Sequence, residues 1–229
     1  MLDNPPLLTI HRGHRRVPAD LLERFRGAQT SHLVDAMAGR GAMSWAIKPL
    51  DPANATFVGP ALTAFAYPAD IIGVYGALSE AQPGDVIVVA NDAYLGAAAI
   101  GDLVAGMMKN KGVAAFVTEG AARDRAGILA TGLPVFAAGV VPTSPAANGP
   151  GVVGAPVTCG GLTVRSGDIV VGDADGVVVV PIEQAEAVLA GLEAVRAVEA
   201  RAIAAVEGGA TDNERIRRVV AEARIIEAG

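Results

Sequence analysis

The stretch 83-PGDVIVVA-90 decides the fold, because a Pro-Gly-Asp turn leads directly into five consecutive apolar residues. An apolar run of this length without alternation is typical of a strand that is buried on both faces of a sheet. Two similar runs follow, 113-VAAFV-117 and 134-PVFAAG-139, and helical segments near 100–110 and 122–130 separate them. Strand, helix, strand, helix and strand with short links predict a parallel βαβαβ unit of the α/β class.

Upstream of this unit the sequence predicts helical segments and one more strand. Residues 1–16 show no regular pattern and are expected to form an irregular arm, and the helical segments that follow end at Gly39. β-Forming residues alternate over 56–66, which predicts a strand, and Asp70 is expected to cap a helix over about 71–81.

Downstream of the unit the pattern changes to short strands and then to helices. A loop rich in Pro, Gly and Ser is expected over 140–155, followed by short antiparallel strands over 156–181 that flank the parallel unit. An Ala-rich helix is predicted over 182–207. We therefore expect one α/β domain over residues 17–207, followed by a C-terminal helical tail over 208–229.

Composition and charge argue against several classes of function. The 229 residues are 52% hydrophobic and only 18% charged, which favours burial of part of the surface between subunits. The net charge of −6 argues against binding of nucleic acid by phosphate neutralisation. The single cysteine, Cys159, fits a reducing, cytoplasmic location. The sequence lacks both a run of about 18 apolar residues, as needed to span a membrane, and the apolar core of a signal peptide.

Polar residues follow all three strands of the unit, at the edge where parallel strands end together. Asn91-Asp92 follow the first strand, 119-EGAARD-124 follows the second, and residues 139–148 follow the third. In open parallel sheets this edge carries the binding crevice. The helix that opens at 100-IGDL-103, with Gly101 just before it, starts on the same side, so its free N–H groups can hold a carboxylate or phosphate.

Three charged residues on this edge form a candidate metal and substrate site. Asp102 and Asp124 start consecutive helices, so their carboxylates are expected to approach one another, and such an oxygen-rich site suits Mg²⁺ or Mn²⁺. Arg123 can grip a substrate carboxylate in a bidentate way. Each residue also has a structural explanation: Asp102 can stabilise the helix dipole, and Arg123 and Asp124 can form an ion pair at a helix start.

Most of the remaining polar residues are expected to be structural. His11 and His14 have the spacing of a metal pair but lie in the basic arm, where solvation is expected. Asp173 is expected in a hairpin turn and Cys159 in the core. A Schiff-base enzyme would have to rely on Lys48, because the other two lysines lie at a polar helix end.

Seven stretches of the chain together resemble one known family. They are 43-MSWAIKPL-50, 57-FVGPALT-63, 83-PGDVIVV-89, 101-GDL-103, 119-EGAARD-124, 134-PVFAAG-139 and 159-CGGLTVRSGDIVVGDADGVVVVP-181. In this order, over about residues 20–205, they resemble the 4-hydroxy-4-methyl-2-oxoglutarate aldolase family. That family also contains the regulators of ribonuclease E activity, and its members often carry a mistaken menaquinone methyltransferase label.

The resemblance implies a β/β/α swivelling-type domain that assembles into trimers or hexamers, with a divalent-metal site between neighbouring subunits. It implies that Asp124 binds the metal and that Asp102 holds it through water. A Glu from the C-terminal helix of a neighbouring subunit completes the water shell in the family, and Glu199 is the nearest match in this chain.

For the substrate, the resemblance implies that Arg123 binds the pyruvoyl part and stabilises its enolate, while backbone N–H groups near Leu103 and Val104 hold the carboxylate. This chain departs from the family's pattern in the loop after the third strand. Aldolases of the family carry a Lys there that helps to bind the substrate, whereas 140-VVPTSPAANGPGVVG-154 contains no Lys.

These patterns lead to one expected function and two alternatives. The expected function is a metal-dependent lyase that cleaves a C–C bond beside a 2-oxo acid, by retro-aldol reaction or by decarboxylation of an oxaloacetate-like acid. The first alternative is a protein-binding regulator without catalysis, against which the retained Asp102, Arg123 and Asp124 argue. The second is a metal enzyme of the same fold that acts on a different, sugar-derived acid.

Overall fold

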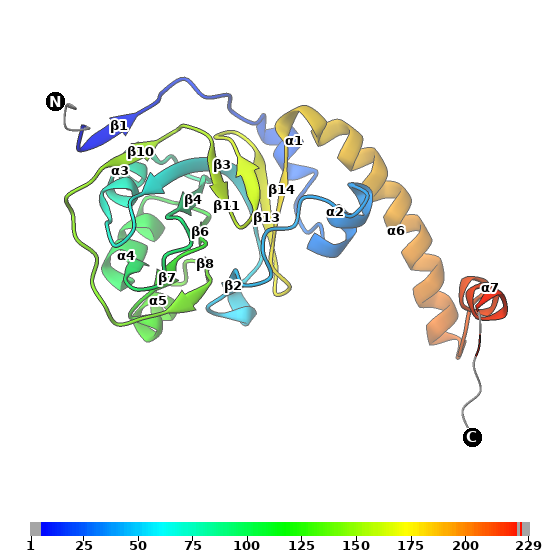
Figure 1. Cartoon of the computed structure of the whole chain (residues 1–229). Coiled ribbons are helices and arrows are strands. Elements are labelled where there is room, and N and C mark those ends of the chain that lie inside the picture. Colours follow the sequence, from blue (N-terminus) through cyan, green and yellow to red (C-terminus); the bar gives the residue numbers. More distant parts are fainter. Residues whose placement is uncertain (1–5, 224, 226–229) are drawn as a thin grey trace.

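A nine-stranded sheet runs through the centre of the computed structural model, which describes residues 6–223 and 225 (Figure 1). Its strands follow the order β1-β10-β3-β4-β6-β8-β2, and β13 pairs with both β3 and β14. The strands are β1 (Leu8–Ile10), β2 (Lys48–Pro49), β3 (Phe57–Ala66), β4 (Val86–Ala90), β6 (Ala115–Thr118), β8 (Val135–Ala137), β10 (Gly151–Val153), β13 (Ile169–Gly172) and β14 (Val177–Val180).

The predicted parallel unit is confirmed, and it extends one strand further than expected. Strands β3, β4, β6 and β8 pair in parallel, and two helices connect the last three of them. The helices of the chain are α1 (Ala19–Glu23), α2 (Thr30–Ala36), α3 (Ile72–Glu80), α4 (Asp102–Asn110), α5 (Arg125–Thr131), α6 (Ala185–Glu207) and α7 (Glu214–Glu222), with 3-10 turns at Pro52–Asn54 and Ile182–Gln184.

The continuous apolar run of β4 is explained by burial of both faces of the sheet. Ile87 and Val89 pack into a core with α3, α4 and α5, whereas Val86 and Val88 pack into a second core that includes Cys159. The second core is covered by the hairpin of β11 (Val157–Cys159) and β12 (Leu162–Val164). Because successive side chains of a strand point to opposite faces, only an uninterrupted apolar run fills both cores.

Two segments expected to be irregular contain strands. Strand β1, within the arm 1–16, pairs in parallel with β10, which lies within the expected loop 140–155 and pairs with β3. A small parallel sheet of β5 (Ala98–Ile100), β7 (Ala121–Ala122) and β9 (Gly139–Val140) was also not expected. These strands have only two or three residues, so their sequences carry no period, and partners distant in sequence determine them.

A third core joins the antiparallel strands β13 and β14 to the helices α1, α2 and α6. Figure 1 shows α6 on the opposite side of the sheet from α4 and α5, with α7 following at the far end. Part of the expected C-terminal tail, residues 224 and 226–229, lies outside the described residues. Within the part of the chain that is described, no helix is long and apolar enough to span a bilayer.

Candidate active site

A cavity of about 420 Å³ opens beside the start of α4. It lies where parallel strands end, as expected for an α/β sheet, and α3, α4 and the loop after β9 form its walls. Its lining residues are Ile71, Tyr75, Leu78, Ile100, Gly101, Asp102, Leu103, Val104, Met107, Arg123, Ser144, Pro145 and Ala147. The cavity therefore combines one charged end with walls that are largely apolar.

The start of α4 places Asp102 at the charged end of the cavity. Strand β5 ends at Ile100, and α4 begins two residues later with Asp102 in its first turn. The Asp102 Oδ1 atom accepts a hydrogen bond of 2.7 Å from the N–H of Leu103. A Cβ atom added to Gly127 of α5 would lie 2.4 Å from Asp102 Oδ2, so the absence of a side chain there lets α5 pack against this carboxylate.

The turn between β7 and α5 brings Arg123 and Asp124 to the same place. The Arg123 N–H donates to the carbonyl of Ile100 at 2.9 Å, which ties the turn to the end of β5. A Cβ atom on Gly101 would lie 2.8 Å from Asp124 Oδ2 and 3.0 Å from Arg123 Nε. The three predicted charged residues thus gather around Gly101, although Asp124 lies at the edge of the cavity and is not part of its lining.

Arg123 and Asp124 form the ion pair that the structural explanation of these residues predicts. Arg123 Nε lies 3.1 Å from Asp124 Oδ2, and Arg123 Nη1 contacts the hydroxyl of Ser144. The Asp124 side chain nevertheless remains 42% exposed, and its backbone has the left-handed conformation, with φ 56° and ψ 42°. A non-glycine residue in this conformation is a local strain that often marks functional sites.

The backbone N–H groups expected to bind a carboxylate are at the predicted place. Gly101 precedes the helix, and Leu103 and Val104 are its second and third residues, so their N–H groups lack partners four residues earlier within the helix. The N–H of Leu103 is taken by Asp102 in the chain alone. A substrate carboxylate would therefore have to compete with Asp102 for this group.

The loop that lacks a lysine is held firmly over the cavity. The Thr143 carbonyl accepts from Ala98 N–H at 3.0 Å, and Ala146 N–H donates to Ala69 at 2.7 Å. The buried carboxylate of Asp70, which was expected to cap α3, accepts from the N–H of Ile72 at the start of this helix and also from the N–H groups of Asn148 and Gly149. Sequence reasoning missed Ser144 on this loop, because no local pattern shows which loop hydroxyl faces a cavity.

Glu199 lies away from this cavity. It is on α6, where its Oε2 atom contacts Nε2 of the buried His32, and α6 is on the opposite side of the sheet from α4 (Figure 1). Among the described residues, no group of three or more His, Cys, Asp and Glu is placed to hold a metal ion. The carboxylates of Asp102 and Asp124 fit an ion such as Mg²⁺, which is commonly bound by one or two carboxylates and keeps several waters.

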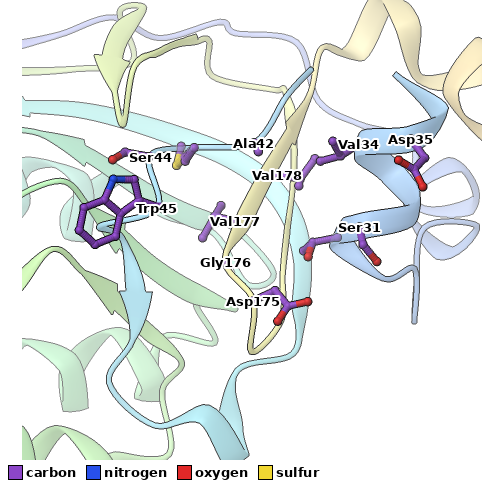
Figure 2. A pocket seen from close by; sticks show the side chains of 12 residues that line it. Ser31, Val34, Asp35, Ala42, Ser44, Trp45, Asp175, Gly176, Val177 and Val178 are labelled. Carbon is purple, nitrogen blue, oxygen red and sulfur yellow. The ribbon is translucent and has the colours of Figure 1, made fainter. Parts of the chain in front are cut away.

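A second hollow of about 270 Å³ lies between α2 and the β13–β14 hairpin (Figure 2). Figure 2 shows the indole of Trp45, which is 84% exposed, and the α2 residues Ser31 and Asp35. The charged side chains in its lining are Asp35 and Asp175, both acidic. This hollow therefore offers no cation to an anionic substrate, and the cavity at α4 is the better candidate.

The remaining polar candidates are structural. Burial raises the pKa of Cys159 to about 12, so this thiol is not a nucleophile. Asp173 holds the start of α2 through Thr30 and its own turn through Asp175. The Lys48 ammonium contacts the Asp175 carbonyl. The expected solvation of His14 in the arm is wrong, because both its ring nitrogens are buried without a hydrogen-bond partner among the described residues. This burial, followed by the charge of Arg16, lowers the pKa of His14.

Comparison with known proteins supplies the context for this site. The family model described as RraA-like, Aldolase/RraA, matches residues 30–179. A protein of Halalkalibacterium halodurans named "Putative 4-hydroxy-4-methyl-2-oxoglutarate aldolase" is 41% identical over 170 residues, which cover 74% of this chain and 80% of that protein.

Two solved structures show the same fold. An uncharacterized protein from Pseudomonas syringae pv. tomato superposes with a TM-score of 0.75 at 27% identity, covering 86% of this chain and 97% of its own. Streptomyces coelicolor RraAS2, described as an unusual member of the RNase ES inhibitor RraA family, superposes with a TM-score of 0.73 at 27% identity. It covers 82% of this chain and 98% of its own.

Proposed function

The chain belongs to the Aldolase/RraA family, and from this premise we propose that it is a divalent-metal-dependent lyase that cleaves a C–C bond of a 2-oxo acid. The reaction is a retro-aldol cleavage of the 4-hydroxy-4-methyl-2-oxoglutarate type, decarboxylation of an oxaloacetate-like acid, or both. Each of these reactions passes through a pyruvate enolate.

One observation carries this proposal. Arg123, the one cation among the described residues that line the cavity, lies beside Gly101 at the start of α4, where a carboxylate residue and the N–H groups of the first helical turn are also found. A 2-oxo acid presents a carboxylate and a neighbouring carbonyl oxygen, and these suit an arginine and a helix start. This arrangement supports a site for the pyruvoyl end of the substrate.

The metal assigned to this site is Mg²⁺ or Mn²⁺. Asp124 would bind it directly and Asp102 would hold it through water, because the Asp124 carboxylate lies beside Gly101, Asp102 is the next residue of the chain, and both offer the oxygen donors that these ions prefer. When bound, the ion would act as a Lewis acid on the 2-oxo group.

Side chains of this chain move the proton and stabilise the charge that develops in the reaction. In the retro-aldol direction the proton of the C4 hydroxyl passes to a base, the C3–C4 bond breaks, and its electron pair forms the enolate of pyruvate. We assign Asp102, acting through a water molecule, as the base that accepts this proton and the acid that returns one to C3. Arg123 stabilises the negative charge of the enolate, which develops during the reaction.

The proposal includes assembly into a trimer or a hexamer. Glu199 cannot serve the cavity of its own chain from the far side of the sheet, so its role in the water shell requires a neighbouring subunit (Figure 1). Exposed apolar side chains such as Trp45, Leu103 and Val206 are consistent with buried contacts between copies. Sedimentation at micromolar concentration checks this, and a monomer would contradict both the assembly and the role of Glu199.

A non-catalytic regulator remains the second candidate, because RraAS2 has the same fold. A metal enzyme that acts on a sugar-derived acid is the third. The discriminating experiment is a screen of 2-oxo acids and sugar-derived acids for pyruvate release, with Mg²⁺, with Mn²⁺ and with excess chelator. We expect metal-dependent pyruvate release that Arg123→Ala lowers about 10²–10³-fold. Absence of pyruvate from every acid in the presence of metal would overturn the proposed lyase.

A further inference from the structure

Helices α2 and α6 meet at a contact between His32 and Glu199, on the side of the sheet away from the cavity. His32 is buried, and its Nε2 atom contacts Oε2 of Glu199. Among the residues that the structure describes, no other group is hydrogen-bonded to this nitrogen. A buried N–H without an acceptor is unfavourable, so the Glu199 carboxylate is the partner on which the imidazole depends. The same contact fixes one oxygen of the carboxylate at α2.

Packing and a helix-start contact keep His32 at a fixed position. Helices α2 and α6 pack side by side in the third core (Figure 1), and a Cβ atom added to Gly191 of α6 would lie 3.2 Å from the Cβ atom and the carbonyl oxygen of Ala36. The absence of a side chain at Gly191 therefore lets the two helices approach closely. At the start of α2 the N–H and the hydroxyl of Thr30 donate to the Asp173 carboxylate, each at 2.8 Å. His32 thus lies on a helix that is held at its start and along its side.

The Glu199 side chain reaches the surface beyond this contact. It is 42% exposed and lines an open hollow of about 460 Å³ together with Asp35, Ala194, Val195 and Val198. Its Oε2 atom contacts His32, so its other oxygen can accept a hydrogen bond from water. A glutamate has three rotatable side-chain bonds and samples several rotamers on a surface whose neighbouring α6 side chains are apolar. The contact with a buried imidazole restricts this freedom to one orientation of the carboxylate.

We propose that His32 is a positioning residue, which holds the Glu199 carboxylate in the orientation that binds the water shell of the metal in a neighbouring subunit. The proposal rests on the proposed function, which assigns Glu199 to that water shell, and adds the residue that orients it. His32 itself touches neither the metal nor the substrate. Outer partners of this kind change metal affinity about 10- to 100-fold, because they orient groups that lie closer to the ion. His32 therefore tunes the metal affinity of a site that belongs to another copy of the chain.

Binding of Mg²⁺ to the full chain without substrate, measured by calorimetry, tests this role independently of catalysis. His32→Leu should raise the Kd for Mg²⁺ about 10-fold. His32→Gln, which can place an N–H donor near the position of Nε2, should restore most of the affinity. Val188→Ala is the control for stability, because Val188 is buried on α6 in the third core, and it should lower the melting midpoint while the Kd stays unchanged. An unchanged Kd in His32→Leu, or the same rise in Val188→Ala, overturns the inference.

A double-mutant cycle shows whether His32 acts through Glu199. Glu199→Ala alone should raise the Kd for Mg²⁺ at least as much as His32→Leu does, because it removes the group that His32 orients. Adding His32→Leu to Glu199→Ala should then produce no further change, since the two residues act as a pair. A further rise of about 10-fold in the double variant would show that His32 affects the metal site by another route, and it would overturn the inference.

Mixed oligomers test whether the pair serves the neighbouring subunit. Chains with Asp124→Ala, produced together with chains that carry His32→Leu, form some sites in which an intact Asp124 faces a Glu199 held by an intact His32. Part of the wild-type Mg²⁺ affinity should therefore return. Chains with His32→Leu mixed with chains that carry Glu199→Ala form no such site and should not recover it. Equal affinity in the two mixtures overturns the inference, whereas lack of Mg²⁺ binding by the wild-type chain overturns the proposed function, and the inference with it.

Discussion

Two of the three Arg-Asp ion pairs among the described residues have the same chemistry and opposite surroundings. Arg16 Nη1 lies 2.6 Å from Asp85 Oδ1, and the Asp85 side chain is 1% exposed. Its second oxygen accepts from the N–H of Gln82 at 2.8 Å, which secures the turn before β4. Arg123 and Asp124 lie 3.1 Å apart, half-exposed, at the edge of a cavity.

The two pairs differ in how many hydrogen bonds each carboxylate already accepts from the protein. Both oxygens of Asp85 are occupied by protein donors, so this pair fixes the N-terminal arm to the sheet. Among the described residues, Asp124 has Arg123 as its one side-chain partner and does not cap its own helix. A carboxylate with free lone pairs and a strained backbone has the properties of a ligand site rather than of a structural cross-link.

The largest expected effect is that of Asp124. Asp124→Ala should abolish metal-dependent pyruvate release and metal binding measured by calorimetry, while the melting midpoint changes little because the side chain is half-exposed. Asp124→Asn, which tolerates the left-handed backbone, controls for strain. Full activity of the wild-type chain in excess chelator would refute the metal site.

Arg123 tests whether the exposed pair serves substrate or structure. If the guanidinium grips the enolate with its planar fork, Arg123→Lys should be nearly as harmful as Arg123→Ala, with kcat lowered about 10²–10³-fold. Arg16→Lys is the matched control and should leave kcat unchanged. Near-wild-type turnover of Arg123→Lys, with a lowered melting midpoint, would make this pair structural.

Asp85 tests whether the buried pair serves stability and not activity. Asp85→Ala should lower the free energy of unfolding by about 2–3 kcal/mol, because it removes the partner of Arg16 and the acceptor of Gln82. Denaturant unfolding measures this loss, and kcat of the remaining folded protein should not change. Glu80→Ala, which breaks the exposed pair with Arg12 on the same arm, should destabilise less. Equal losses of stability in Asp85→Ala and Glu80→Ala would show that burial does not set the strength of these ion pairs.

The smallest effect concerns the packing behind Asp102. Gly127→Ala places a Cβ atom 2.4 Å from Asp102 Oδ2, so the carboxylate must shift, and we expect kcat/KM to fall about 10-fold. Gly106→Ala on α4 meets its nearest atom, Thr131 Cγ2, at 3.8 Å and should leave activity intact. Both changes raise helix propensity, so melting curves show whether stability explains any difference. Equal activity of the two variants would remove Asp102 from the chemistry.

The sequence alone predicted the parallel unit and the three charged residues. The run of β4 had to be a strand between two cores, because no other element of that length buries both faces. Asp102, Arg123 and Asp124 were predicted because residues that follow parallel strands meet at one edge. Both predictions use local rules: an apolar run indicates a buried strand, and the residues that follow a parallel strand lie at the edge where it ends.

Only the tertiary structure decided the rest of the site. The pairing of β1 with β10, the small β5-β7-β9 sheet, the contact of Ser144 with Arg123 and the fit of Gly127 against Asp102 each join segments distant in sequence. Two- or three-residue strands have no measurable period, and neither a glycine nor a serine indicates which distant atom it meets. The sequence therefore determined which residues stand at the edge of the sheet, whereas packing determined the cavity they face, because its walls come from elements that have no local relation to one another.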